Sequence, residues 1–310
     1  MYLVCGEALF DVFVEGEEGA GSVQFAARAG GSPFNVAIGL ARLGLPAALL
    51  TGVSRDLLGK RLARVLADEG VSDSYLLRTD RPTTISLVGL DADGVPAYQF
   101  YDTGSAGSGV TAADLPALGS EVWGLHFGSY SIAVPPVADA FAGLAASQRD
   151  RFVSLDPNVR PTVEPDMDVW RTRVAGLVPH VDLVKISSED LELLYPGRPH
   201  EGAAHGWLNV GASLVVVTDG GRAAQAWTAS GLTATVAPPP IQVIDTVGAG
   251  DTFQAALLAR LASGGCSPRD AVATLDLDGL EAMLDYAARA AAITCSRRGA
   301  DLPRAHELTD

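Results

Sequence analysis

Short runs of β-branched and aliphatic residues alternate with helical patterns along most of the chain. Each run is long enough for one buried strand, and each following segment has the apolar spacing and end signals of a helix. Repeated strand–helix units predict an α/β protein with a mostly parallel sheet that is covered on both faces. The strands are expected at 2–5, continuing through 9–14, and at 47–53, 124–127, 152–155, 183–186, 213–218 and 231–237. The helices are expected at 33–44, 56–69, 136–147, 169–178, 188–194, 251–261 and 280–295.

Two β-rich runs depart from this alternation. Thr83–Leu90 and Ala97–Tyr101 have no helix between them and are separated by Asp91–Gly94, a strong hairpin signal. Together with Phe13–Ala29 they are expected to form a small sheet apart from the main one. Such a sheet would act as a lid that excludes water from a site. No linker divides the chain, so we expect a single domain, 1–310, with a lid from about 12–29 and 83–105.

Composition restricts the partners. The 310 residues are 48% hydrophobic, which supports a large core, and carry a net charge of −15. This charge disfavours nucleic acids and anionic membranes. No apolar leader is visible, and no stretch approaches the roughly 20 apolar residues that span a bilayer. Cys5, Cys266 and Cys295 show no disulfide or metal spacing, so a cytoplasmic location is expected.

The stretch Ile241–Phe253 carries the clearest chemical signal. Its β-branched beginning predicts the end of a strand, which breaks at Gly248-Ala249-Gly250 before a helix opened by Asp251. Backbone N–H groups and the helix dipole would attract a phosphate at this turn. A carboxylate at the same place has two interpretations. Asp251 either caps the helix or takes a proton from a hydroxyl group that attacks phosphorus.

Other polar residues lie where strands end or helices begin, where α/β proteins bind ligands. Asp11 follows an apolar run, and its alternative is a solvated turn residue. Gly30 and Gly31 leave room for a ligand against the backbone, and Asn35 offers a donor and an acceptor one turn into a helix. Arg160, with Asn158, follows another strand and suits sugar hydroxyls or a transferring phosphoryl group; its alternative is a surface arginine after a proline turn.

Two further strand ends suit a nucleotide. Lys185 could bind phosphates beside Glu189 and Asp190, which could hold a hydrated metal; a capping serine with solvated acids is the alternative. Thr218–Gly221 could form a wall against adenine and phosphates. The chain contains neither a Walker lysine loop nor the protein-kinase motifs. Phosphoryl transfer would therefore depend on helix-end dipoles, a metal and one base.

Two segments together resemble a known family. Gly30-Gly31-Ser-Pro-Phe-Asn35-Val-Ala37, followed by Leu43-Gly44, resembles the first signature of the PfkB, or ribokinase-like, carbohydrate kinases. Asp245-Thr-Val-Gly-Ala-Gly-Asp251 is similar to their second signature at every position. The resemblance implies a ribokinase-like three-layer α/β/α sandwich with a central, mostly parallel sheet and a small β-sheet lid. It also implies an ATP-dependent sugar kinase that uses Mg²⁺ and, in many relatives, K⁺.

The resemblance also implies a role for each matching residue. Asp251 would be the general base, and Gly248, Ala249 and Gly250 the anion hole. The remaining expectations are a sugar site at Asp11, Gly30, Gly31, Asn35 and Arg160, a nucleotide site at Lys185, Thr218, Gly220, Gly221, Ala292 and Cys295, a Mg²⁺ site through water at Glu189 and Asp190, and a monovalent-cation site at Asp245 and Thr246.

Within the family, several stretches are most similar to bacterial fructokinases: Cys5–Asp11, Gly30–Asn35, Phe127–Tyr130 and Asp156–Arg160. The resemblance implies transfer of the γ-phosphoryl group of ATP to the terminal hydroxyl of D-fructose. A 2-keto-3-deoxygluconate kinase, or another sugar kinase of the family, is the alternative. A non-catalytic sugar-binding homologue is disfavoured, because the base and the glycines are present. Lid sheets of this family often pair, so a homodimer through the lid is a further expectation.

Overall fold

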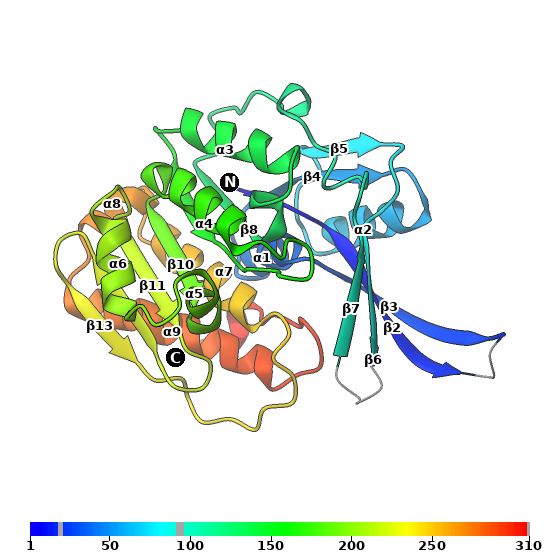
Figure 1. Cartoon of the computed structure of the whole chain (residues 1–310). Coiled ribbons are helices and arrows are strands. Elements are labelled where there is room, and N and C mark those ends of the chain that lie inside the picture. Colours follow the sequence, from blue (N-terminus) through cyan, green and yellow to red (C-terminus); the bar gives the residue numbers. More distant parts are fainter. Residues whose placement is uncertain (18–20, 91–95, 309–310) are drawn as a thin grey trace.

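The computed structural model describes residues 1–17, 21–90 and 96–308. Nine strands form the main sheet, whose strands run parallel apart from the antiparallel pairings of β12 and β13 at one edge (Figure 1). In spatial order they are β13 (Thr233–Val236), β12 (Ala224–Thr228), β11 (Leu214–Thr218), β10 (Leu183–Ser187), β9 (Phe152–Asp156), β8 (Gly124–Gly128), β1 (Tyr2–Cys5), β4 (Ala47–Ser54) and β5 (Leu76–Thr79).

Helices cover both faces of this sheet. One face packs against α1 (Ser32–Arg42), α2 (Leu57–Asp68), α7 (Ala249–Ala262), α8 (Pro268–Ala273) and α9 (Leu277–Cys295). The other packs against α3 (Val137–Ser147), α4 (Met167–Leu177), α5 (Ser188–Leu194) and α6 (His200–Leu208). The predicted three-layer α/β/α sandwich is confirmed.

Alternation along the central strands produces these two cores. In β1, Tyr2 and Val4 join the core under α1 and α7, whereas Leu3 and Cys5 join the core under α3 and α4. Both sets are fully buried, which explains why β1 is apolar at every position. None of the described helices is long and apolar enough to cross a membrane.

A separate four-stranded sheet projects from the main body, as predicted (Figure 1). Its order is β3 (Val23–Gly30), β2 (Leu9–Glu17), β6 (Ile85–Leu90) and β7 (Pro96–Tyr101). The central pair, β2 and β6, is parallel and the outer pairs are antiparallel. The predicted hairpin turn at 91–94 lies outside the described residues.

Two predicted features of the chain path are wrong. The first strand does not continue through Leu9–Val14: β1 ends at Cys5, and β2 begins in the other sheet. Asp11 therefore lies within β2, opposite Ser86 and Arg28, and not at a strand end. The run Ile241–Ile244 is not a strand either. It follows three prolines, which lack N–H donors, and the Ile244 N–H donates to the Cys295 carbonyl at 2.8 Å.

Several short elements escaped sequence analysis. The strands β5 and β12 are only 4 and 5 residues long, too short to establish a pattern. The helix α6, which contains His200 and His205, was not predicted either. This helix begins after Pro199 and has a mixed surface with three buried residues, so its apolar periodicity is weak.

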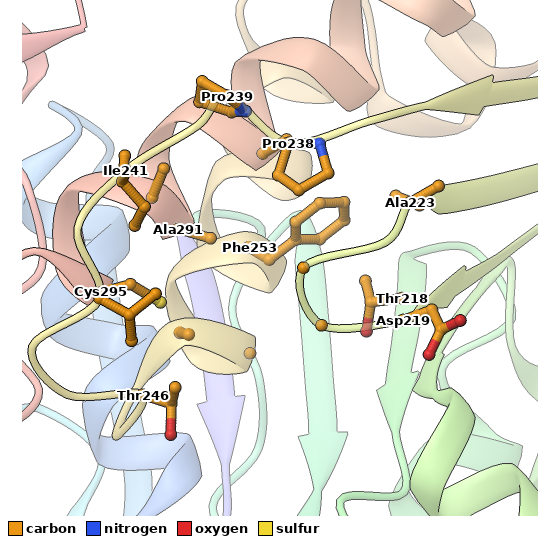
Figure 2. Close-up of a pocket in the computed structure, with 18 of the residues that line it drawn as sticks. Thr218, Asp219, Ala223, Pro238, Pro239, Ile241, Thr246, Phe253, Ala291 and Cys295 are labelled. Atoms are coloured by element: carbon orange, nitrogen blue, oxygen red, sulfur yellow. The ribbon is translucent and has the colours of Figure 1, made fainter.

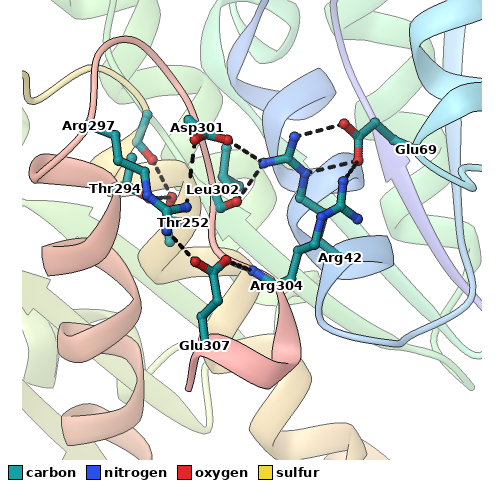
Figure 3. Close-up of polar contacts among 10 residues, drawn as sticks. Arg42, Glu69, Thr252, Thr294, Arg297, Asp301, Leu302, Arg304 and Glu307 are labelled. Atoms are coloured by element: carbon teal, nitrogen blue, oxygen red, sulfur yellow. Dashed lines mark hydrogen bonds and ion pairs between the residues drawn. The ribbon is translucent and has the colours of Figure 1, made fainter. Parts of the chain in front are cut away.

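An ion-pair network ties the C-terminal segment to the main body (Figure 3). Arg42, at the end of α1, binds both carboxylate oxygens of Glu69 and also pairs with Asp301 at 2.8 Å. Arg304 pairs with Glu69 at 3.2 Å, and Arg297 pairs with Glu307. The Arg42 and Glu69 side chains are 14% and 17% exposed, so solvent screens this pair less than an ordinary surface pair.

We expect Arg42→Met to lower the free energy of unfolding by about 2 kcal/mol, because charge-assisted hydrogen bonds to a half-buried carboxylate are lost. Urea unfolding measures this change. Arg64→Met is the matched control: Arg64 makes an exposed pair with Asp68 at 3.6 Å, and its loss should cost less than about 0.5 kcal/mol. Equal effects of the two substitutions would contradict a special role for Arg42.

Candidate active site

The order of the strands in the main sheet determines where the site lies. From β1 the chain builds the sheet outward through β4 and β5, and then returns to add β8 on the other side of β1. The loops that follow β1 and β8 therefore leave the sheet in opposite directions and open a crevice between them. Glu7, directly after β1, and Ser129 and Tyr130, directly after β8, line that crevice.

A cavity of about 510 Å³ occupies the crevice, and we call it the polar cavity. The small sheet supplies one wall, and α1, the loop after β9 and the start of α7 supply the others. Its lining comprises Glu7, Leu9, Asp11, Phe13, Gly31, Ser32, Asn35, Ser86, Val88, Phe100, Ser129, Tyr130, Asn158, Arg160, Pro161, Thr162, Thr246, Val247, Gly248, Gly250 and Asp251.

A second cavity, also of about 510 Å³, lies on the other side of the α7 N-terminus, and we call it the apolar cavity. In Figure 2 the Phe253 ring lies beneath Pro238, with Thr218 and Asp219 on one side and Ile241 and Cys295 on the other. Such a slot suits a flat aromatic group with a polar extension. Its lining comprises Thr218, Asp219, Gly220, Gly221, Ala223, Ala224, Pro238, Pro239, Pro240, Ile241, Val243, Thr246, Ala249, Gly250, Phe253, Ala288, Ala291, Ala292 and Cys295.

The two cavities meet at one turn, since Thr246 and Gly250 line both. Gly248 is the N-cap of α7 and adopts a left-handed conformation with φ of 78°. The first N–H groups of any helix lack acceptors within the helix, and the helix dipole adds a partial positive charge. An anion that passes from one cavity to the other would therefore be stabilised at this boundary.

Asp251 stands in the first turn of α7 and faces the polar cavity. Two side chains of α1 hold its carboxylate: Ser32 Oγ donates to Oδ1 at 2.6 Å and Asn35 Nδ2 donates to Oδ2 at 2.8 Å. The residue is 7% exposed. Burial raises the pKa of Asp251 above its usual value, against the lowering effect of the Ser32 and Asn35 hydrogen bonds.

The helix-cap interpretation of Asp251 is wrong. Gly248 holds the N-cap position and makes no side-chain cap bond. Both carboxylate oxygens of Asp251 accept from α1, not from the N–H groups of α7. The carboxylate is thus fixed in place by a neighbouring helix and is directed into a cavity, as a proton acceptor requires.

A buried ion pair lies behind this turn. Lys185 Nζ is 2.8 Å from Asp156 Oδ2, and both side chains are almost completely buried. The same ammonium group approaches Gly250 so closely that a Cβ there would lie 3.1 Å from it. Lys185 lines neither cavity, but it adds positive charge next to their boundary.

The structure distinguishes the two candidate metal carboxylates. Glu189 is exposed, whereas Asp190 is half-buried and accepts from the Val159 N–H at 3.2 Å. Burial, and to a smaller extent the nearby Asp156, raise the pKa of Asp190 to about 6. Asp156 Oδ1 is buried and has no hydrogen-bond partner among the described residues. Free carboxylate oxygens of this kind fit Mg²⁺, which prefers oxygen ligands.

The remaining predicted residues fall into two groups. Asp11, Gly31, Asn35 and Arg160 line the polar cavity, and Thr218, Gly220, Gly221, Ala292 and Cys295 line the apolar one, as expected. Gly30 lines neither; a Cβ there would lie 2.9 Å from Asp11 Oδ2, so Gly30 makes room for that carboxylate.

Asp245 organises the backbone next to Thr246. Its Oδ1 accepts from the Val247 N–H at 3.0 Å and its Oδ2 from the Gly299 N–H at 2.8 Å. Burial would raise the pKa of Asp245, but these backbone hydrogen bonds bring it below its usual value. Asp245 is therefore a carboxylate that joins the turn to the C-terminal segment.

Several lining residues were not predicted from the sequence, above all Glu7, Ser32 and Phe253.

Strained backbone gives an independent indication of the same site. Ser129 and Asn158 are the two non-glycine residues of the described chain with positive φ, at 58° and 44°, and both line the polar cavity. Strained backbone of this kind is concentrated at functional sites.

Comparisons with known proteins agree with this geometry. A family model described as pfkB family carbohydrate kinase matches residues 3–307. The chain belongs to the PfkB family of carbohydrate kinases. A fructokinase from Rhizobium leguminosarum bv. trifolii is 39% identical over 310 residues, covering 100% of this chain and 92% of that protein.

Solved structures show the same relationship. A fructokinase with bound ATP from Xylella fastidiosa superposes with a TM-score of 0.90 at 26% identity, over 99% of this chain and 96% of that one. A double mutant of fructokinase from Vibrio cholerae O395, in a fructose-, ADP- and potassium-bound form, gives a TM-score of 0.83 at 26% identity, over 99% and 96%. The predicted family, and the predicted class of ATP-dependent carbohydrate kinase, are confirmed.

In this kinase we expect Gly248→Ala to lower the free energy of unfolding by about 1–3 kcal/mol. The backbone at Gly248 is left-handed, a conformation that alanine disfavours, and the added Cβ would lie 2.6 Å from Ala300 Cβ. Gly143→Ala, in α3, is the control: nothing lies within 4 Å of its Cβ position, and its φ is not positive. The control should be neutral or slightly stabilising in thermal unfolding, and equal losses for both variants would contradict the packing argument.

Proposed function

We propose that this kinase transfers the γ-phosphoryl group of ATP to the terminal hydroxyl of D-fructose. One observation carries the proposal: a polar and an apolar cavity meet at a helix N-terminus, with a desolvated carboxylate on the polar side. Two substrates held on either side of this turn would bring a hydroxyl and a phosphoryl group together. Positioning and electrostatic stabilisation of this kind supply most of the catalysis in phosphoryl transfer.

In the proposed step Asp251 takes the proton of the sugar hydroxyl. The hydroxyl oxygen forms a bond to the γ-phosphorus, and the bond from that phosphorus to the bridging oxygen breaks, which leaves ADP. Gly248, Ala249 and Gly250 form the anion hole, where the α7 dipole and the N–H groups of Gly248 and Gly250 stabilise the transferring charge, while the Ala249 N–H donates to the Thr246 carbonyl at 3.2 Å. Lys185, next to Gly250, adds to this stabilisation from behind the turn.

ATP is assigned to the apolar cavity. Adenine would lie between Phe253 and the proline segment on one side and Ala292 and Cys295 on the other. The phosphates would then extend past Gly220 and Gly221 toward Thr246 and Gly250. The bound ATP of the Xylella relative supports a nucleotide in this class of fold.

Asp190, with Asp156, would hold Mg²⁺, and Glu189 is too exposed to share that role. The metal, when bound, neutralises charge on the nucleotide phosphates. Asp245 and Thr246 would bind a monovalent cation. Each carboxylate oxygen of Asp245 accepts one hydrogen bond from a backbone N–H group and keeps a lone pair for the cation. The potassium ion in the Vibrio relative supports this assignment.

The charges of the polar cavity favour a neutral sugar over an acidic one. Glu7, Asp11 and Asp251 face it with three carboxyl groups, against the single guanidinium of Arg160. A substrate such as 2-keto-3-deoxygluconate brings its own carboxylate, which would meet more repulsion than attraction. Fructose brings only hydroxyl and carbonyl oxygens, which suit carboxyl and amide partners.

The small sheet would serve as the lid, since Asp11, Phe13, Ser86, Val88 and Phe100 line the polar cavity from it. Its other surface exposes apolar side chains: Val14, Val23, Phe25 and Tyr101 are 40–55% exposed. Exposed apolar groups on a sheet favour pairing with a second copy, so a homodimer through this sheet is part of the proposal.

Asp251→Asn should lower kcat for fructose at least about 10²-fold, because the amide cannot accept the hydroxyl proton. Fructose binding, measured by thermal shift, should persist, since the amide can still meet Ser32 and Asn35. In the wild type kcat/KM should fall on the acid side at a pH above that of an ordinary aspartate, because burial raises the pKa of Asp251 and the protonated form is inactive. Near-normal turnover of the variant would disprove the assigned base.

Substrate identity is tested by ADP release with fructose, 2-keto-3-deoxygluconate, ribose and adenosine. We expect fructose to give a kcat/KM at least tenfold above that of the acidic sugar, equivalent to about 1.4 kcal/mol of discrimination. Greater activity with 2-keto-3-deoxygluconate would reject the charge argument and support the alternative function.

A further inference from the structure

Glu7 is a buried carboxyl group that the proposed reaction does not yet use. It follows β1 at the crevice, is 2% exposed and lines the polar cavity. Its Oε2 has no hydrogen-bond partner among the described residues. An unpaired buried polar atom lowers the stability of the fold, so proteins seldom contain one unless a ligand later supplies its hydrogen-bond partner.

The neighbouring Asp102 is a buried carboxylate whose Oδ1 receives its hydrogen bonds from the protein itself. Asp102 is 7% exposed, and its Oδ1 accepts from the hydroxyl groups of Thr84 at 3.0 Å, Ser105 at 2.8 Å and Tyr130 at 3.2 Å. It does not line the polar cavity. The protein therefore supplies three hydroxyl donors to Asp102 Oδ1, whereas Glu7 Oε2, beside the cavity, receives none from the described residues.

The charges around Glu7 allow it to carry a proton. The pKa of Glu7 is raised to about 7, mainly by burial with a smaller contribution from Asp102, against the lowering effects of the Ser129 hydrogen bond and of Arg160. Tyr130 also faces it but stays neutral, because burial raises the pKa of its phenol. Near neutral pH the Glu7 carboxyl can thus donate a hydrogen bond as well as accept one.

The pKa of Asp251 is affected by other neighbours than the pKa of Glu7 is. Its pKa is affected, after burial, by Ser32, Asn35, Asp156 and Lys185, whereas Glu7 responds to Ser129, Arg160 and Asp102. The Asp251 carboxylate is held by Ser32 and Asn35 of α1, whereas Glu7 Oε2 receives no hydrogen bond from the described residues. A group bound by Glu7 would be distinct from the hydroxyl that Asp251 deprotonates.

We propose that Glu7 is a specificity-determining residue, whose free Oε2 hydrogen-bonds a hydroxyl group of the sugar other than the one phosphorylated. This inference rests on the proposed sugar-kinase function of the polar cavity. Glu7 would then select sugars that place a hydroxyl group at this position, because a sugar that lacks it leaves the buried oxygen unpaired.

The test compares Glu7→Gln, Glu7→Leu and Asp102→Asn with the wild type in steady-state kinetics with fructose, together with thermal unfolding. Glutamine keeps a donor and an acceptor, so its KM at pH 7 should stay within about threefold of the wild type. Leucine removes both and should raise KM at least tenfold, with kcat changed less than about threefold. Asp102→Asn should lower the melting temperature but leave KM unchanged at pH 6, below the pKa of Glu7.

The pH dependence gives a readout that a purely structural role would not affect. Deprotonation of wild-type Glu7 removes its donor and leaves a charged acceptor, so KM for fructose should change between pH 7 and 9. In Glu7→Gln it should stay flat. This comparison decides the matter even if the leucine variant does not fold. An unchanged KM in Glu7→Leu, or identical pH profiles for wild type and Glu7→Gln, would overturn the proposal.

Failure of the proposed function is recognised separately. If wild-type protein does not turn over fructose, the fructokinase assignment fails. The variants are then compared with whichever sugar of the panel wild type phosphorylates best, and by the thermal shift that this sugar induces. A tenfold weaker response confined to Glu7→Leu would still support Glu7 as a sugar contact.

Discussion

The structure depends on one junction, the turn from Thr246 to Asp251 at which two cavities meet. Its geometry is imposed from several directions. Helix α1 fixes the Asp251 carboxylate through Ser32 and Asn35, and Ala300 of the C-terminal segment packs against Gly248, where only a glycine fits. Asp245 accepts hydrogen bonds from backbone N–H groups of both the turn and that segment. Elements far apart in the chain thus hold one short stretch of backbone in place, which is the preorganisation that phosphoryl transfer needs.

Local charge matters more than net charge at this junction. The chain carries −15 overall, so long-range attraction cannot bring a polyanion to the site. The helix dipole of α7 provides a local positive potential instead and is fixed before any ligand arrives, whereas the buried ammonium of Lys185 is paired with Asp156. The carboxyl groups of the polar cavity balance this potential on the other side. The site therefore separates an anion-binding half from a half that suits a neutral polyol.

Much of the fold and the site could be predicted from the sequence. Apolar runs and helix signals identified most of the main sheet, and parallel strands place their loops at one edge, so polar residues after several strands were expected together. What failed had physical causes. Ile241–Ile244 has strand-forming residues, but it follows three prolines and the Ile244 N–H donates to the Cys295 carbonyl, since β-propensity describes a fit to a sheet and not an intrinsic backbone choice. The role of Asp251 could not be decided locally, because its partners lie more than 200 residues away. Glu7 lacked any local signal, since its importance comes from burial after β1.

The most direct test is a crystal structure of the protein with a non-hydrolysable ATP analogue and fructose. The account predicts adenine beside Phe253 in the apolar cavity, the γ-phosphoryl group against the N–H groups of Gly248–Gly250, and the terminal hydroxyl of fructose within about 3 Å of an Asp251 carboxylate oxygen. A nucleotide in the polar cavity, or a sugar whose terminal hydroxyl faces away from Asp251, would contradict it.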